Sequence, residues 1–317
     1  MMNKNKAVVL LNMGGPNSLH EVKVFLQNMF NDPYILSIKS DFMRKMVANF
    51  IVNKRLEESQ NNYKQIGGKS PLVALTFSLC EKLNVLNSEY YFTYAMRYTP
   101  PFAKMVAFDL FQKGVEEIIL FSMYPHFSYT TFQSSYEDFL KALKELNYHP
   151  KIKVVKNYYW DKLYNQAILK KIKEGLADKN SKDFHLIFSA HSLPQRNINR
   201  GDPYQKEILE NVEILKELLA KEGLDFASIK VAYQSKIGPI KWLEPSLQHL
   251  LKSYKDKKVI IYPIAFTMDN SETDFELSLQ YKQEALSLGI KEFIVCKCLN
   301  DDEDFAKFIL NQLKEAK

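Results

Sequence analysis

Short runs of Val, Ile, Leu and Phe recur along the chain and alternate with longer segments of helical spacing. The apolar runs have the length of strands that are covered on both faces, as in parallel sheets. They are residues 7–13, 116–125, 151–159, 184–191, 257–266 and 291–299. The segments 136–146 and 204–223 repeat apolar residues at helical spacing, which predicts amphipathic helices. The alternation predicts an α/β protein with doubly wound parallel sheets.

The order of these elements predicts two similar domains. The chain has 317 residues, which is enough for two domains that each bury a core. The first series closes near residue 150, and a second begins with the run KIKVV at residue 151. We therefore expect domains at 1–150 and 151–317, with the last helix, 302–317, packing on either. Unusual side chains follow strands of both series, so we expect a ligand cleft between the domains.

Composition and charge narrow the classes of partner. The formal net charge is +6, with Lys and Glu interspersed along the chain rather than gathered in blocks. This favours an anionic small molecule or a lipid surface and predicts no nucleic-acid partner. The N-terminal apolar run ends at a Gly-Gly-Pro turn, so we expect neither a signal peptide nor a membrane span. These features predict a cytoplasmic protein.

The cysteines are too few for a disulfide framework. The chain has three, Cys80, Cys296 and Cys298, which indicates a reducing compartment. Cys296 and Cys298 alternate along EFIVCKCL, so a strand there would place both on one face. Without a second cysteine pair, we expect buried thiols rather than a metal site.

Two glycine-containing turns resemble phosphate-binding loops. In LLNMGGPNS, Ser18 and Glu21 have the spacing of a capping box that opens a helix. A helix start behind a glycine turn can hold an anion, but the pattern of a dinucleotide site is missing. The segment YKQIGGKSPL carries Tyr63 where a Walker loop needs glycine, so we reject a nucleotide site. Its cation, hydroxyl and phenol, with Arg55 upstream, suit carboxylates.

A histidine and a set of acids are the sharpest candidates for chemistry. His191 ends the apolar run FHLIFSAH, and its position alone gives a catalytic and a structural role about even weight. Asp269, Glu272 and Glu276 are spaced i, i+3 and i+7, so on a helix they share one face. A cap made by Asp269 and Glu272 would leave Glu276 unexplained. Three acids on one face raise one another's pKa, which fits proton transfer or capture of a divalent cation.

Aromatic residues gather in the same loops. Tyr98, Tyr124, Phe127, Trp242 and Phe266 all follow predicted strands or lie in loop motifs. Aromatic residues at strand ends usually pack in the core. Around a cleft that also holds a histidine and acids, they predict a large, flat, apolar ligand.

Taken in order, these motifs resemble those of the ferrochelatase family over nearly the whole chain. They are LLNMGGP, YKQIGGKSPL, AMRYTPP, YPHFSYTTFQSS, FSAHSLP, NRGDPY, YQSKIGPIKWLEPS and PIAFTMDNSETDFEL. The resemblance implies two Rossmann-like domains facing a porphyrin cleft, a chelatase-like fold. It implies a lyase that inserts Fe²⁺ into protoporphyrin IX with release of two protons, in haem and porphyrin biosynthesis.

The resemblance also assigns roles to residues of this chain. It implies that His191 and Glu272 face each other as catalytic groups and metal ligands, and that Glu276 continues the acidic line. Substrate binding is implied for Met13, Arg55, Tyr63, Ser70, Arg97, Tyr98, Tyr124, Trp242, Phe266 and Asp269. A neutral imidazole can accept a pyrrole proton near neutral pH, and a carboxylate opposite it can attract iron or pass protons on.

Three departures and preferences accompany the resemblance. Asn270 stands where many relatives carry a histidine, so no second imidazole is expected there. No cysteine-rich segment follows LNQLKEAK, so we expect no cofactor and no iron–sulfur cluster, and iron acts as a substrate. The motifs around Met13 and His191 are more similar to those of protoporphyrin enzymes than of coproporphyrin enzymes. The sequence assigns no role to His126.

Residues 24–55 mix apolar side chains with Lys and Arg. The pattern is typical of amphipathic helices that pack on a core, and in the family this region forms a lip of the cleft. The mixture predicts peripheral contact with a membrane, at the inner membrane of a bacterium.

Two alternatives stay open on the sequence alone. One is a chelatase for coproporphyrin or another tetrapyrrole; the chain length and the Glu272 motif favour a ferrochelatase. The other is a porphyrin carrier without catalysis, which would need the apolar pocket but neither His191 nor Glu272.

Overall fold

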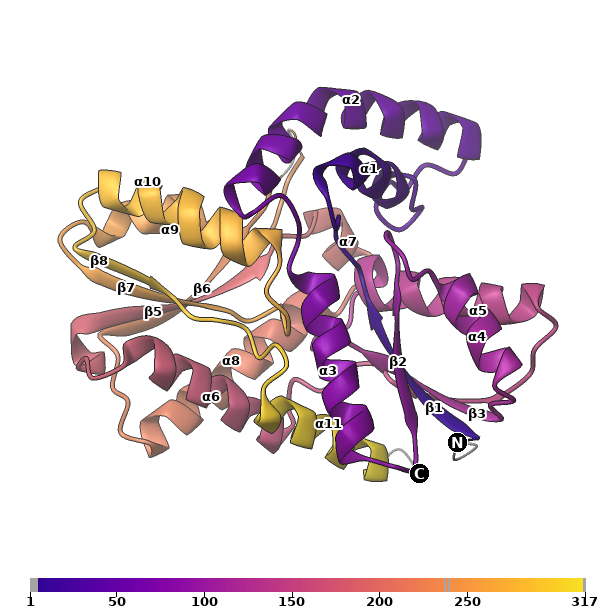
Figure 1. Ribbon diagram of the computed structural model, residues 1–317. Helices are drawn as coiled ribbons and strands as arrows, with labels where there is room; N and C mark the ends of the chain where they lie inside the picture. Colours follow the sequence, from indigo (N-terminus) through magenta and orange to yellow (C-terminus); the bar gives the residue numbers. More distant parts are fainter. Residues whose placement is uncertain (1–4, 237, 239, 316–317) are drawn as a thin grey trace. The chain divides into compact units, whose positions relative to one another are not determined.

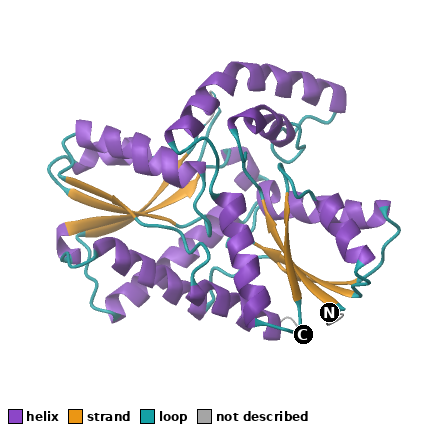
Figure 2. Cartoon of the chain, viewed as in Figure 1, coloured by secondary structure: helices purple, strands orange, loops and turns teal. Residues whose placement is uncertain are grey.

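The chain forms two compact units in a computed structural model that describes residues 5–236, 238 and 240–315 (Figure 1). The first unit is Met1–Asn157 with Ala306–Lys317, and the second is Tyr158–Phe305. Each unit is built on a four-stranded parallel sheet with helices on its faces, which confirms the predicted α/β class (Figure 2). Residues 237 and 239 of the motif 233–246, and the ends of the two expected domains, lie outside the described residues.

The first sheet has the strand order β2-β1-β3-β4, and every pair in it is parallel. Its strands are β1 (Lys6–Asn12), β2 (Tyr91–Met96), β3 (Glu117–Ser122) and β4 (Lys151–Val155). The central strands β1 and β3 are almost wholly buried because helices cover both faces, which explains their unbroken apolar sequence.

The helices of the first unit lie on the faces of this sheet or in a separate apolar cluster. They are α1 (Val22–Phe30), α2 (Asp41–Gln65), α3 (Leu72–Leu86), α4 (Ala103–Gln112), α5 (Ser134–Glu145) and α11 (Glu303–Glu315), with the short η1 (Leu19–Glu21) and the π-helix η2 (Tyr129–Gln133). One core joins Val9 and Leu120 to Leu110 of α4 and Phe139 of α5. A separate apolar cluster joins α1, α2 and Tyr98.

The second sheet repeats this order as β6-β5-β7-β8, again parallel throughout. Its strands are β5 (Phe184–His191), β6 (Ser228–Gln234), β7 (Lys258–Pro263) and β8 (Glu292–Val295). In both sheets the first strand of the unit lies beside the third, so the order reverses between them. Ligand sites of doubly wound sheets lie at such a reversal, beyond the carboxyl ends of the strands.

The helices of the second unit lie on two sides of its sheet (Figure 1). They are α6 (Lys162–Leu176), α7 (Gln195–Asn199), α8 (Tyr204–Lys221), α9 (Leu247–Leu251) and α10 (Lys282–Ser287), with η3 (Ser181–Asp183), η4 (Lys252–Tyr254) and the π-helix η5 (Glu272–Tyr281). The face with α9, η5 and α10 packs Ile187 and Ile261 against Leu251 and Leu277. The π-helix η5 therefore begins at the carboxyl end of the sheet with its apolar side held by the core.

Several details differ from the sequence predictions. The strand at 151–155, expected to open the second domain, pairs with β3, so the change of unit falls after Asn157 rather than at residue 150. The prediction of a capping box is wrong, because the Ser18 side chain makes no cap hydrogen bond. The Glu21 carboxylate instead accepts a hydrogen bond from the Asn17 N–H (2.9 Å). Strands β2 and β6 were not predicted.

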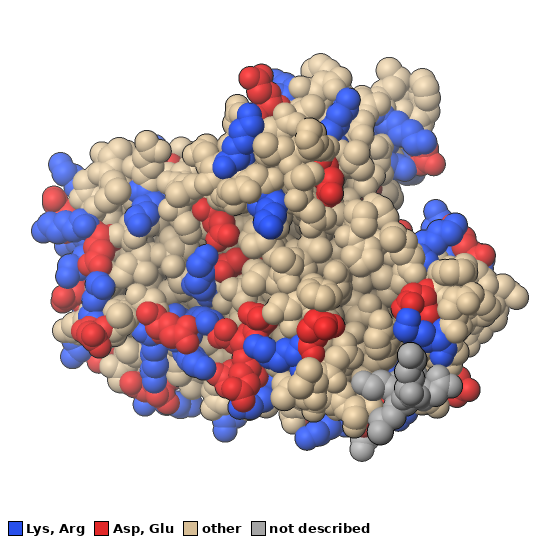
Figure 3. Space-filling view, in the orientation of Figure 1, with Lys and Arg blue, Asp and Glu red and all other residues tan. Residues whose placement is uncertain are grey.

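On the face drawn in Figure 3, acidic and basic side chains are intermixed where charged groups gather, and uncharged side chains cover much of the rest. This distribution agrees with the spacing of Lys and Glu in the sequence. Among the described residues, no helix combines the length and apolar character that crossing a membrane requires.

Candidate active site

The strand ends of the second unit bring together three segments that are far apart in the sequence. His191 is the last residue of β5 and lies opposite Gln234, the last residue of β6, in the parallel register. Strand β7 ends at Pro263, and the chain then leads into η5, which begins at Glu272. Because the carboxyl ends of parallel strands meet at one edge, these side chains share one site.

His191 and Glu272 form a direct pair. His191 Nδ1 lies 2.8 Å from Glu272 Oε2, and both side chains remain partly exposed, at 36% and 21%. The Tyr204 hydroxyl donates a hydrogen bond to the backbone carbonyl of His191 (2.9 Å), which fixes the strand tip. Because Nδ1 is engaged with the carboxylate, Nε2 is the ring atom that a substrate would meet.

Glu276 joins this pair through Ser235, the residue after β6. The Ser235 N–H donates to Glu276 Oε1 (2.9 Å), and the Ser235 hydroxyl lies 2.8 Å from Glu272 Oε2. The same hydroxyl also contacts Glu276 Oε2. Gln234 Nε2 lies at the limit of hydrogen bonding to Glu272 (3.5 Å), and its Oε1 accepts from the Ser189 hydroxyl (2.6 Å). The two glutamates are therefore held from strands β5 and β6.

Burial and neighbouring charges shift the pKa values of His191, Glu272 and Glu276 in different directions. Burial alone would lower the pKa of His191, but the Glu272 carboxylate outweighs it and raises that pKa above the usual value. Burial would raise the pKa of Glu272, but the charge and hydrogen bond of His191 lower it. Both directions favour an imidazolium–carboxylate pair at neutral pH.

The pKa of Glu276 is raised, whereas that of Glu272 is lowered. Burial first, and then repulsion from Glu272, raise the pKa of Glu276 from 4.5 to about 7. Two acids four residues apart thus differ in protonation near neutral pH, a pattern typical of sites that move protons.

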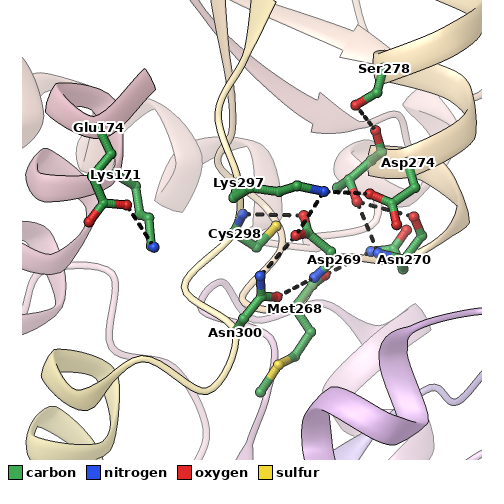
Figure 4. A network of polar contacts seen from close by, with 11 residues as sticks. Lys171, Glu174, Met268, Asp269, Asn270, Asp274, Ser278, Lys297, Cys298 and Asn300 are labelled. Carbon is green, nitrogen blue, oxygen red and sulfur yellow. Dashed lines mark hydrogen bonds and ion pairs between the residues drawn. The ribbon is translucent and has the colours of Figure 1, made fainter. Parts of the chain in front are cut away.

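Asp269 does not share the face of these glutamates, because its carboxylate lies against Lys297, Cys298 and Asn300 (Figure 4). Its carboxylate accepts hydrogen bonds from the Cys298 N–H (3.2 Å) and the Asn300 side chain (2.8 Å), with Lys297 Nζ at 3.5 Å. Lys297 also contacts Asp274 of η5 (2.9 Å), so Asp269 ties the loop after β8 to the start of η5. The expectation of three acids on one face is therefore wrong for Asp269, because the helix begins only at Glu272.

Asn270 occupies the turn before η5. Its side-chain oxygen accepts from the Glu272 N–H (2.8 Å), and its amide donates to the Met268 carbonyl (3.1 Å). Asparagine side chains commonly make such turns with their own backbone. Asn270 therefore helps to begin the helix.

Two predicted aromatic residues of the second unit flank the strand tips. Trp242 lies in an isolated antiparallel bridge with Pro194, and the Leu243 N–H donates to the Leu193 carbonyl (3.0 Å), so this segment pairs with the loop after His191. Phe266 is half-buried between β7 and η5.

In the first unit, the predicted Arg97 and Tyr98 share a buried acid, Asp32. The Tyr98 hydroxyl donates to Asp32 Oδ2 (2.8 Å), and an Arg97 nitrogen lies 3.1 Å from the same oxygen. Ser134 also contacts Asp32, which is only 1% exposed. Burial, and then the Asp32 charge, raise the pKa of Tyr98 well above its usual value, so Tyr98 is a neutral phenol.

Other predicted residues of the first unit are only partly brought together. Met13, Tyr63 and Tyr98 belong to one apolar cluster. Ser70 is buried, and its N–H donates to the Pro16 carbonyl (2.8 Å), whereas Arg55 is half-buried on α2. For these residues, and for the partly buried Tyr124, substrate binding stays a prediction.

Among the residues of these networks that the sequence pattern did not single out are Gln234, Ser235 and Asp32. Ser235 follows a strand that was not predicted, and Asp32 is an ordinary acid after a helix. His126 is buried. Across the parts of the chain that are described, no group of three or more His, Cys, Asp or Glu side chains is arranged to hold a metal ion. Metal ligation by His191 and Glu272 therefore stays a prediction.

Comparisons with known proteins add to this geometry. The ferrochelatase family model matches residues 5–317. The ferrochelatase of Helicobacter pylori (strain P12) is 52% identical over 313 residues, which are 98% of this chain and 94% of that protein. The ferrochelatase of Wolinella succinogenes is 53% identical over 310 residues and 98% of both chains. The solved structure of SirB from Bacillus subtilis with Fe³⁺ has a TM-score of 0.59 at 9% identity, covers 98% of this chain and 95% of its own, and shows the fold alone.

Proposed function

Because the chain belongs to the ferrochelatase family, we propose that it is a lyase that inserts Fe²⁺ into protoporphyrin IX to form haem, with release of two protons. The observation that carries the proposal is the His191–Glu272 pair, 2.8 Å apart at the carboxyl end of the second sheet and open on one side. Ferrous iron is a substrate in this reaction, and the proposal includes no resident cofactor.

The site offers the groups that metallation requires. Two pyrrole protons must leave, and a dication must be held near the ring nitrogens while they do. Glu272 is ionised beside His191 and supplies the negative charge that attracts iron. Glu276, with a pKa of about 7, can accept or release a proton near neutral pH.

The pair also limits what His191 can do before substrate arrives. Because Glu272 raises the pKa of His191, the resting imidazole holds its proton more firmly than an isolated histidine. Approach of Fe²⁺ to the pair would favour release of that proton to solvent, and the neutral imidazole would then accept one from a pyrrole nitrogen.

The test is anaerobic Fe²⁺ insertion, followed by absorbance, with protoporphyrin IX and coproporphyrin III in parallel. We expect insertion by the wild type and losses of about 10²- to 10⁴-fold for His191→Ala and Glu272→Gln. His185→Ala is the matched control, because His185 lies on the same strand and contacts Ser228 at its other end.

The parallel substrates separate the alternatives. Preferential insertion into coproporphyrin III would support the proposed reaction and show that coproporphyrin III, not protoporphyrin IX, is the preferred substrate. Tight porphyrin binding without insertion in any variant would instead establish the non-catalytic carrier.

We also propose that α2 contacts a membrane surface and that the protein works in the cytoplasm. Phe42, Met46 and Phe50 recur every four residues on α2 and are exposed, Phe42 and Phe50 at 70%. In Figure 3, basic and some acidic side chains stand in a largely uncharged surface over α2. Such a face suits anionic lipid headgroups, because the apolar rings insert while the cations remain at the interface.

Liposome flotation tests this contact. We expect the wild type to float with vesicles that contain anionic lipid, and Phe42→Ser/Phe50→Ser to float much less. Phe77→Ser is the matched control, because Phe77 is an exposed ring of α3. Equal flotation of the double variant and the wild type would contradict the proposal.

A further inference from the structure

Ser235 has a backbone conformation that serine seldom adopts. Its φ is +64°, in the left-handed region where residues other than glycine are uncommon. Such conformations cost free energy and recur at functional sites, where the surrounding structure holds them in place. At Ser235 the conformation sets the backbone N–H and the hydroxyl against the same helix, η5.

Both donors of Ser235 are used on two carboxylates. The N–H donates to Glu276 Oε1 (2.9 Å), and the hydroxyl lies within hydrogen-bond distance of Glu272 Oε2 (2.8 Å) and also contacts Glu276 Oε2. A hydroxyl has one hydrogen and two lone pairs, so it can donate to one carboxylate while it accepts from the other acid when that acid carries a proton. A complete set of hydrogen bonds therefore joins the two glutamates through one oxygen atom.

We propose that Ser235 is a positioning residue of the iron-insertion site, which holds Glu272 and Glu276 in one hydrogen-bonded line that leads away from His191. The kinetic part of this inference rests on the proposed function. Without Ser235, two carboxyl groups of one helix turn would face each other across an unfilled gap, and their repulsion would separate them.

Residues at the ends of β5 and β6 hold Ser235 in position. Gln234, its neighbour, accepts from the buried Ser189 hydroxyl of β5 (2.6 Å) and directs its amide toward Glu272. The position of the serine is thus fixed by the same sheet edge that carries His191. Outer groups that orient ionic ligands in this way commonly change activity by about 10- to 100-fold when they are removed.

Two substitutions at this position separate the hydroxyl from the backbone. Ser235→Ala removes the hydroxyl and keeps the strained φ, whereas Ser235→Gly removes the hydroxyl and relieves the strain. We expect both to lower kcat for iron insertion by about 10- to 100-fold with little change in KM for the porphyrin. We expect the glycine variant to resist unfolding better than the alanine variant.

Ser278→Ala is the matched control. Ser278 lies on the same π-helix, and its hydroxyl donates to the Thr273 carbonyl (2.7 Å), away from the glutamates. We expect it to keep the wild-type kcat. The inference would be overturned if Ser235→Ala kept the wild-type kcat, or if the substitution raised only KM for the porphyrin. Loss of kcat in the alanine variant alone would assign the effect to folding and would overturn it as well.

A second measurement does not depend on catalysis. Both tryptophans, Trp160 and Trp242, lie in the second unit, so tryptophan fluorescence in urea follows the unfolding of that unit in the full chain. In a double-mutant cycle of Ser235→Ala and Glu276→Ala, we expect coupling of roughly fivefold or more in the unfolding equilibrium constant.

The two measurements distinguish the two proposals. If the double-mutant cycle shows coupling but the protein inserts no iron, the proposed function is refuted. The inference that Ser235 positions the two carboxylates then still stands. Additive effects in the cycle would refute the inference about Ser235, whatever the enzyme activity.

Discussion

The raised pKa of Glu276 predicts how the stability of the second unit depends on pH. The folded value is about 7, against 4.5 for the free side chain. Between these values the folded protein binds more protons than the unfolded chain, so the free energy of unfolding falls as pH rises. The difference of roughly 2.5 pKa units corresponds to about 3 kcal/mol, which is fully lost above the folded pKa.

Glu276→Gln removes this dependence, because the amide cannot ionise. Near pH 5 the folded wild type carries a largely neutral Glu276. Ionisation of this side chain then lowers the free energy of unfolding of the wild type little relative to the variant. Near pH 8 the wild type holds a partly buried carboxylate beside Glu272, and we expect the variant to gain most of about 3 kcal/mol relative to it. The raised pKa of His191 also makes stability fall as pH rises through its folded value, but both proteins contain this group.

Urea unfolding followed by tryptophan fluorescence measures this difference. Both tryptophans report on the second unit, and the exposed Glu217→Gln on α8 is the control for loss of a surface charge there. We expect the control to keep the pH dependence of the wild type. Parallel pH curves for the wild type and Glu276→Gln would refute the reasoning that burial and Glu272 raise this pKa.

Two further predictions concern a glycine that follows β1 and the acid that ties the loop after β8 to η5. Gly14 has φ +83°, and a Cβ there would lie 2.2 Å from Thr99 Oγ1, so Gly14→Ala should lower the free energy of unfolding by about 2 kcal/mol or more in thermal melts. Gly114→Ala, with φ +66° and open space, should lose less, and equal losses would contradict the steric argument. Asp269→Asn should destabilise the second unit by about 1–3 kcal/mol in urea and leave KM for the porphyrin unchanged; a raised KM with unchanged stability would instead support substrate binding.

The sequence predicted the other strands and missed β2 and β6, whose segments YFTYAM and SIKVAYQ interrupt their apolar residues with Thr, Ser, Lys and Gln. Exposure alone does not explain this difference, because the edge strands β4 and β8 are also partly exposed and were predicted. The change of unit was misplaced because local pattern says nothing about pairing. Strand β4 looks like the start of a new series until its register with β3 is known.

The site was predicted where a residue type stands out at a strand or helix end. His191 and Glu272 are 81 positions apart, yet each ends or begins an element at the same sheet edge. Ser235 gave no such signal, since its role depends on a left-handed backbone and on two side chains from another segment. Asp269 was grouped with the glutamates because the spacing assumed a helix that begins three residues too early.

The membership of α11 in the first unit has a consequence for synthesis on the ribosome. The second unit is one continuous segment, but the first needs the helix at 303–315, whose Phe308 ring packs edge-on against Phe121 of β3 (6.3 Å). After β4 emerges, about 150 more residues must be translated before that helix follows, which takes on the order of ten seconds. During this interval the segment made first lacks the helix that packs on Phe121 of β3, while the segment made second can already complete its core.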